Sequence, residues 1–205
     1  MLTPKRYESS KYNCEQLMIE IKRYFEKIVD ISEKDWEIFS SKLIRREFLK
    51  KSVILKIGMK ENYLSFIEIG IVRKCIPQEF DDLTFEFEFP GNFVSAYDIF
   101  LTQQPSFYQL ETITDTVLWS LTYNDLQKIY AETDIGNTIG RLASESLFIK
   151  KSNRELSLLN QSAEERYLNL FREKPDLLKY IPLKYIASYI GITPQALSRI
   201  RKRIT

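Results

Sequence analysis

The chain of 205 residues carries a formal net charge of only +2 and contains two cysteines and no histidine. Two cysteines are too few for a four-thiolate cluster or an unaided zinc site, and the absence of histidine removes the usual general base. We therefore expect no enzyme activity, no cofactor and no metal site. The first residues lack a secretory apolar segment, and no apolar run approaches the length of a membrane span, so we expect a cytoplasmic protein without membrane contact.

Charge is distributed unevenly along the chain. Residues 75–127 contain nine Asp or Glu and no Lys or Arg, whereas residues 128–205 contain fourteen Lys or Arg and eight Asp or Glu. An argument for an anionic partner must therefore rest on where the charge lies and not on its total.

Two short helices are predicted before residue 43. The first helix, over 14–28, is amphipathic, with apolar residues at helical spacing at Leu17, Ile21, Phe25 and Ile28. Ser32 and Asp35 match a capping box and predict the start of the second helix.

The range 43–121 has the texture of a β domain. Short runs rich in Ile, Val, Phe, Tyr and Thr are separated by Gly and Pro, which predicts several strands in a small barrel or sandwich. In the range 85–89 Phe alternates with Glu, so we expect a strand with one face buried and one face solvated. The range 123–132 returns to a helical pattern, and the predicted fold class is therefore α+β.

The range 134–159 predicts one long helix. Its seam residues recur at alternating steps of three and four, the spacing of a two-stranded coiled coil, and a polar residue within such a seam fixes register and strand number. A homodimer follows if the seam is real; alternatively, the stripe packs only on the chain's own β domain. The seam residues are Ile139, Leu142, Ser146, Ile149, Asn153 and Leu156.

The range 182–203 predicts two short helices joined by a tight turn. Ala187 allows a second helix to approach closely, and Gly191 is placed where the chain must turn sharply. Thr193 can cap the next helix, and Pro194 suits its first position. This spacing favours a helix-turn-helix over the alternative, which is the last two amphipathic helices of an ordinary core.

The second of these helices has a basic, polar exposed face. From Leu177 onward the chain contains six Lys or Arg and no Asp or Glu. Gln195 and Arg199 are the best-placed readers of bases, because glutamine pairs bidentately with adenine and arginine with guanine. Four cations are better suited to phosphates, namely Lys184, Arg201, Lys202 and Arg203.

With a β-roll, a long helix, a hinge at Asn160 and Gln161 and a helix-turn-helix in this order, the chain resembles the Crp/Fnr family of bacterial transcription regulators over nearly its whole length. The range 162–202 resembles a subgroup common in Bacteroidetes-type bacteria, and Ile57-Gly58 and Gly70-Ile71-Val72-Arg73 look like the opening strands of its β-roll.

The resemblance implies a domain of the cyclic-nucleotide-binding type over 1–133, a dimerisation helix and hinge over 134–160, and a DNA-binding domain over 161–205. It further implies double-stranded DNA with an inverted-repeat operator as the ligand of a homodimer, with RNA polymerase as a further partner. By position, Gln195, Ser198 and Arg199 match the residues that read bases in the family.

The chain departs from the family pattern in two respects. Members that bind cyclic AMP carry a Gly-Glu pair and a nearby arginine, whereas Pro90-Gly91-Asn92 lacks the glutamate and residues 104–108 offer no arginine. With no cation nearby, an acidic surround should repel a cyclic phosphodiester, so we predict that cyclic AMP does not bind. The chain also leaves no room for a C-terminal wing hairpin, and we expect none.

The sequence is equally consistent with a β domain that binds a small-molecule effector and with one that binds none. Cys75 is interpreted as a buried structural thiol, with a redox role as the alternative. If the β domain has an effector, its lining is an aromatic set that is equally consistent with plain core, namely Phe93, Ser95, Tyr97, Phe100, Phe107 and Tyr108.

The sequence therefore predicts a homodimeric, sequence-specific DNA-binding transcription regulator whose effector is not cyclic AMP. The competing interpretation is a ligand-binding or interaction module whose terminal helices dock a protein. Salt dependence separates the two, because DNA binding weakens steeply with salt through counterion release.

Overall fold

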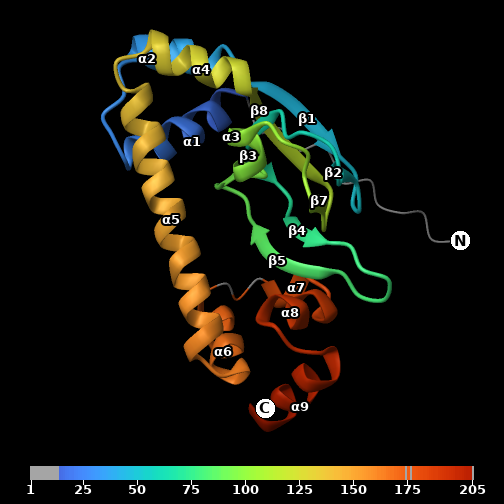
Figure 1. The fold of residues 1–205 in the computed structure, drawn as a ribbon. Coiled ribbons are helices and arrows are strands. Elements are labelled where there is room, and N and C mark those ends of the chain that lie inside the picture. Colours follow the sequence, from blue (N-terminus) through green and yellow to red (C-terminus); the bar gives the residue numbers. More distant parts are fainter. Residues whose placement is uncertain (1–13, 174, 176, 205) are drawn as a thin grey trace, which may run out of the picture.

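The computed structural model describes residues 14–173, 175 and 177–204, with the side chains of residues 14–17, 177 and 178 outside that description. A β-sandwich forms the centre of the molecule, a long helix runs along one side of it, and a group of short helices closes one end (Figure 1). The α+β fold class predicted from the sequence is confirmed. The side chain of Leu17, predicted to be on the apolar face of the first helix, lies outside the described residues.

Two four-stranded antiparallel sheets make up the sandwich. The first has the order β1 (Ile44–Phe48), β8 (Thr116–Thr122), β3 (Tyr63–Ile69) and β6 (Phe93–Val94). The second has the order β2 (Val53–Leu55), β7 (Gln109–Thr112), β4 (Val72–Ile76) and β5 (Leu83–Glu88), which leaves β5 at an edge. Buried aliphatic side chains such as Ile67, Val72 and Leu118 fill the space between the sheets.

Strand β5 corrects one prediction. Its alternating Phe and Glu residues were expected to place the glutamates in solvent, but Glu86 and Glu88 are 4% and 7% exposed. Lysine side chains from the long helix cover this face of the strand and pair with both carboxylates. Phe87, from the opposite face, packs against Tyr189 of the terminal helices. Both faces of the strand are therefore covered.

Helices α1 (Cys14–Glu26), α2 (Glu33–Ser40) and α4 (Tyr123–Glu132) pack on the first sheet. The short helix α3 (Tyr97–Thr102) follows β6 and precedes β7 in the chain. Aromatic side chains dominate this second core, including Phe25, Phe66 and Trp119. The predicted cap of α2 is confirmed, because the Ser32 hydroxyl accepts the Asp35 N–H at 3.1 Å. The predicted helix over 123–132 has the same bounds in the structure.

Helix α5 (Gly136–Asn160) is the long helix expected over 134–159. Its first turns pack closely on α4, since a Cβ on Gly140 would lie 2.7 Å from the Tyr130 hydroxyl. Four short helices follow: α6 (Ala163–Glu173), α7 (Leu177–Tyr180), α8 (Leu183–Ile190) and α9 (Pro194–Ile204). A reciprocal capping box starts α6, because Glu165 N–H donates to Ser162 and Ser162 N–H donates to Glu165.

Within the described part of the chain, no helix is both long enough and apolar enough to cross a bilayer.

Candidate functional site

Helices α8 and α9, which we call the terminal helix pair, have the turn that the sequence predicted. Gly191 ends α8 with φ +80°, a conformation that favours glycine, and its position in the turn is confirmed. The Thr193 hydroxyl accepts the Ala196 N–H at 3.2 Å, and α9 begins at Pro194. Ala187 is fully buried between the helices.

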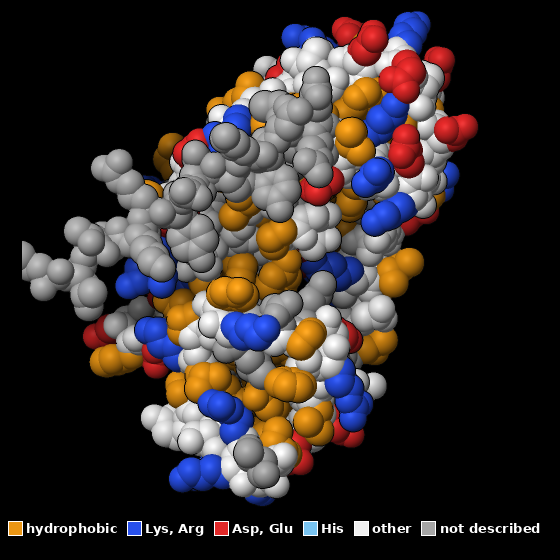
Figure 2. Space-filling model, turned by 180° about the vertical axis from the view of Figure 1, so that it is seen from behind, with side chains coloured by type: hydrophobic (Ala, Val, Ile, Leu, Met, Phe, Trp, Pro, Cys, Tyr) orange, Lys and Arg blue, Asp and Glu red, His pale blue; other side chains and the backbone are white. Residues whose placement is uncertain are grey.

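The exposed face of α9 carries the residues predicted to read bases. Gln195, Ser198 and Arg199 are all exposed, while Leu197 and Ile200 are buried against α8. Lys and Arg side chains are present at this end of the molecule (Figure 2). This face therefore presents polar and cationic groups to solvent.

The four predicted phosphate-binding cations are also exposed. Arg203 forms an ion pair with Glu164 at 2.5 Å, and the Lys184 ammonium lies 4.0 Å from the Asp81 carboxylate. Such exposed pairs contribute little to stability and are screened by salt. They can therefore be exchanged for contacts with an anionic partner at low cost.

The terminal helix pair docks on the edge of the second sheet, a contact that the sequence did not predict. Ser188 on α8 bridges the open edge of β5, because its hydroxyl accepts the Thr84 N–H at 2.8 Å and donates to the Asp82 carbonyl at 3.1 Å. Apolar side chains continue the contact, with Ile71 and Phe87 of the sandwich in one buried cluster with Ile186 of α8. A helix in this position covers a strand edge that would otherwise be unpaired.

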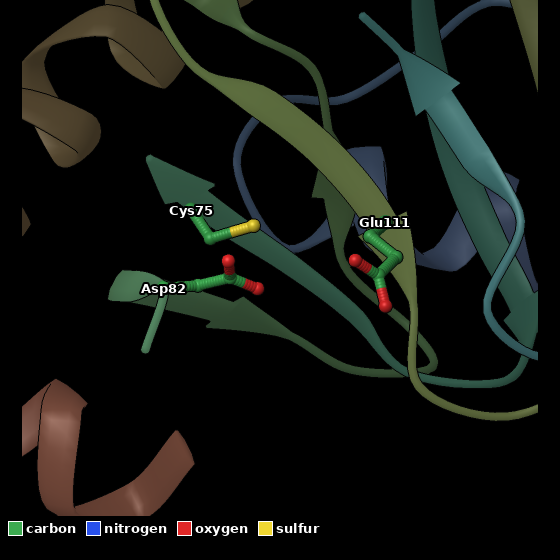
Figure 3. Close-up of side chains that lie close together, drawn as sticks. All are labelled: Cys75, Asp82 and Glu111. Atoms are coloured by element: carbon green, nitrogen blue, oxygen red, sulfur yellow. The ribbon is translucent and has the colours of Figure 1, made fainter. Parts of the chain in front are cut away.

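A buried arginine joins the same contact from β4. The Arg73 guanidinium is 1% exposed, pairs with Asp82 at 2.5 Å and Glu111 at 2.9 Å, and lies 3.8 Å from the Tyr185 ring centroid. Cys75 approaches the same two carboxylates, and Figure 3 shows the three side chains on neighbouring strands and the turn before β5.

These three side chains have the geometry of a metal site, with their ligand atoms within 4.8 Å of one another. The positive charge there is already supplied by Arg73. Burial raises the pKa of the Cys75 thiol to about 11, which keeps it protonated near neutral pH. The group is therefore best explained as a structural ion pair beside a buried thiol.

Two further arginines hold the C-terminal end of α8. Arg154 of α5 donates to the Tyr189 carbonyl and stacks on the Tyr189 ring at 4.0 Å, and Arg166 of α6 donates to the Ile190 carbonyl at 2.8 Å. Cations near a helix C-terminus are favourable because the last carbonyls lack partners within the helix. The long helix and the terminal helix pair are thus connected directly.

A cavity of about 260 Å³ lies between the β-sandwich and helices α1, α4 and α5. We call it the interhelical cavity. Of the predicted effector lining, Phe93, Ser95 and Tyr97 are on its wall. Phe100 is instead fully buried in the aromatic core, and Phe107 is 64% exposed.

The last residue of that set, Tyr108, is buried elsewhere. Its hydroxyl donates to Asp98, its ring packs edge-on against Phe85, and it is not on the cavity wall. Three of the six predicted residues therefore surround one space, and the other three serve other parts of the fold.

The prediction that no cation lies near residues 90–108 is wrong, because the fold brings two lysines to the interhelical cavity. Lys74 of β4 and Lys150 of α5 both lie on the wall of the interhelical cavity. The Glu86 carboxylate is 2.8 Å from the Lys74 ammonium and 3.1 Å from that of Lys150. Burial raises the pKa of the Glu86 carboxyl, but Lys74, Lys150 and Lys151 outweigh it, and the net pKa is well below the usual range.

The predicted seam of α5 is divided between two environments. Ile139 and Ser146 lie on the cavity wall, and Leu142 is half-buried. Asn153 is exposed, as are Ile149 and Leu156, at 57% and 55%. Phe148 and Leu159 extend this exposed apolar surface, whereas the Leu158 side chain lies beside Gly191 of the terminal helix pair.

Residues 45–133 match the family described as the cyclic nucleotide-binding domain. No curated protein sequence matches the chain. Several solved structures are nevertheless similar over most of its length.

A putative transcriptional regulator of the Crp/Fnr family from Eubacterium rectale is 16% identical, with 89% of this chain and 87% of that chain covered and a TM-score of 0.68. FixK2 from Bradyrhizobium japonicum is also 16% identical, with 79% and 84% covered and a TM-score of 0.66. CLP, a c-di-GMP-responsive global regulator of Xanthomonas campestris, is 18% identical, with 84% and 91% covered and a TM-score of 0.62. At these identities the similarity is one of fold, and the subgroup suggested by residues 162–202 stays a prediction.

Proposed function

We propose that this chain, which contains a cyclic nucleotide-binding domain and has the fold of Crp/Fnr-type transcription regulators, is a homodimeric, sequence-specific DNA-binding regulator. The observation that carries the proposal is the outer face of α9, where Gln195, Ser198 and Arg199 are exposed together beside Arg201 and Lys202. A recognition helix requires this combination, because base edges are read by side chains near its N-terminus while cations contact phosphates. In a dimer, two such helices enter successive major grooves about 34 Å apart.

The two classes of contact are separated by a matched pair of variants. Arg199→Ala removes a bidentate partner for guanine, so we expect binding to one specific site to weaken by about 1–3 kcal/mol, with relaxed preference at one base pair. Lys202→Ala removes a phosphate contact, so we expect a smaller slope of log K against log salt and an unchanged preference.

Gel-shift titrations at several salt concentrations measure both quantities on DNA selected from the source genome. An equal loss on specific and random DNA for Arg199→Ala would contradict the base-reading role. Binding that is insensitive to salt would favour the alternative, in which the terminal helix pair docks a protein.

The dimer is proposed to form through the outward face of α5. Ile149 and Leu156 are seven residues apart and lie on this face with Phe148 and Leu159. Apolar residues at this spacing pack against a second copy of the same helix in a coiled coil. The face that carries Lys150, Lys151 and Arg154 is occupied by the chain's own sandwich and α8, so the proposed dimer contact does not compete with it.

Cyclic AMP is not the proposed effector. The backbone amides of Tyr63 and Ala96 donate to the buried carboxyl group of Glu61, at 3.0 and 3.4 Å, and the Ser95 hydroxyl donates to the Tyr63 carbonyl. These donors are therefore used within the protein, and a phosphodiester placed there would meet Glu61. We expect no saturable thermal shift with micromolar cyclic AMP, and a clear shift would refute this part of the proposal.

A further inference from the structure

The wall of the interhelical cavity is mostly aromatic and aliphatic. Residues from five helices and four strands contribute to it, and α5 provides one side of the wall from Gly136 to Lys150. The apolar wall residues include Tyr24, Phe25, Leu64, Phe93, Tyr97, Leu126, Ile129, Ile139, Ala143 and Leu147. Such a wall buries the body of a small apolar ligand, and a volume of about 260 Å³ is slightly below the usual range for ligand pockets, which favours a small ligand.

One end of the cavity is polar. Its charged wall residues are Lys74, Glu88 and Lys150, and Tyr24 and Asn92 lie on the same wall. Burial raises the pKa of the Tyr24 hydroxyl, an effect strengthened by Glu88 and opposed by Lys150, so the hydroxyl stays a hydrogen-bond donor. The tyrosine hydroxyl, the asparagine amide and the lysine ammonium groups together provide donors suited to an anionic head group.

The charges at this end do not balance. The ammonium groups of Lys74, Lys150 and Lys151 share the carboxylates of Glu86 and Glu88. Glu86 contacts all three lysines, whereas Glu88 contacts Lys150 alone. On the cavity wall itself, Lys74 and Lys150 face Glu88, which leaves one excess positive charge. The excess is the same when Glu86 and Lys151 are counted, which pair with these residues but are not on the wall. The carboxylates are buried while Lys150 and Lys151 are half-exposed, and one additional carboxylate would equalise the charges.

From this imbalance we infer that the interhelical cavity binds a small monocarboxylate with an apolar body, as the effector of the regulator proposed above. The ligand carboxylate lies beside Lys150, within reach of Tyr24 and Asn92, and the body lies against Phe25, Phe93 and α5. A dianion would reverse the imbalance, and an amine would enlarge it. An uncharged molecule of the same shape gains only the apolar contact.

Binding at this place acts directly on the long helix. Lys150 is on α5, and the carboxylates with which it pairs are on β5. A ligand carboxylate at Lys150 therefore competes with Glu88 for the ion pair that joins α5 to β5. A ligand of this kind favours whichever position of α5 relative to the sandwich gives it the better contact, and thereby changes the relative populations of the two arrangements.

The test uses the full chain and three probes of one shape: 4-phenylbutyrate, 4-phenylbutan-1-ol and 4-phenylbutylamine. Isothermal titration calorimetry is expected to show saturable binding of the acid, binding at least about tenfold weaker for the alcohol, and none for the amine. Equal affinity for acid and alcohol, or no binding of the acid at millimolar concentration, would overturn the inference.

Two variants locate the site. Lys150→Gln is expected to reduce affinity for the acid about tenfold and to leave the alcohol unchanged, because only the charge contact is lost. Ala143→Phe fills the cavity and is expected to abolish binding of both probes, while Lys128→Gln on the exposed face of α4 serves as a charge-matched control. Circular dichroism and thermal unfolding confirm that each variant is folded, and acid binding that survives both cavity variants would place the ligand elsewhere.

DNA binding is measured on the same samples without a probe. Specific DNA binding together with no acid binding would refute this inference and leave the proposed function intact. Acid binding without specific DNA binding would refute the proposed function, and with it the effector role, and leave the assignment of the cavity's ligand class intact.

Discussion

Replacing Ser188 by alanine removes both hydrogen bonds with which α8 covers the edge of β5. The Thr84 N–H, in a residue that is 1% exposed, loses its acceptor, and the Asp82 carbonyl loses a donor. A buried donor left without a partner costs about 1–3 kcal/mol. For a chain of this size each kcal/mol lowers Tm by about 2–4 °C, so we expect Ser188→Ala to lower Tm by roughly 2–12 °C.

Thermal unfolding and amide hydrogen exchange measure the effect. Ser198→Ala is the matched control, because it removes the same hydroxyl from an exposed position on α9 and should change stability by no more than about 0.5 kcal/mol. In Ser188→Ala the Thr84 amide is expected to exchange faster, since its local protection depends on α8. If the two variants have the same Tm and Thr84 keeps its exchange rate, the bridge contributes nothing and the reasoning is refuted.

Three further outcomes are expected. Gly70→Ala should destabilise the protein far more than Gly58→Ala: both glycines have positive φ, but a Cβ on Gly70 would lie 2.6 Å from the Asp115 carbonyl oxygen, whereas nothing lies within 4 Å of one on Gly58. Chemical denaturation compares them, and similar losses would contradict the close approach. Cys75 should resist iodoacetamide in the folded protein and react only in denaturant, because the thiol is buried and its pKa is raised to about 11. Peptide mass spectrometry detects the adduct. Rapid labelling without denaturant would instead show an accessible thiolate. Leu156→Asp should shift the protein from dimer to monomer in analytical ultracentrifugation. Leu101→Asp, at a similarly exposed leucine on α3, is the control and should leave the dimer intact. An unchanged mass for Leu156→Asp would exclude the face of α5 that carries Leu156 as the dimer contact.

Local signals in the sequence predicted much of the fold. The pair Ser32 with Asp35 marked a helix start that the structure contains, and Gly191 marked the turn between α8 and α9. These signals work because a cap or a positive φ depends on residues within one turn of the chain. The exposure of the α9 face followed in the same way from the helical period, since the positions opposite the apolar stripe face solvent.

Contacts between distant segments were not predictable in this way. The period of two in β5 showed that Glu86 and Glu88 share a face, but a solvated glutamate and one paired with a lysine give the same pattern. The partners, Lys150 and Lys151, are more than sixty residues away in sequence. The contact of Ser188 with Thr84 spans 104 residues and carries no motif. The same limit explains why only half of the predicted effector lining surrounds the cavity.

Strand β5 touches both the cavity and the terminal helix pair within residues 84–88. Glu88 lies on the cavity wall, and its neighbour Phe87 packs on Tyr189 with ring centroids 5.3 Å apart. A molecule in the cavity that alters the position of β5 must therefore alter how firmly α8 is held, without any signal passing along the hinge. Thermodynamic reciprocity then requires that any partner which draws α8 away change the affinity of the cavity for its occupant by the same factor.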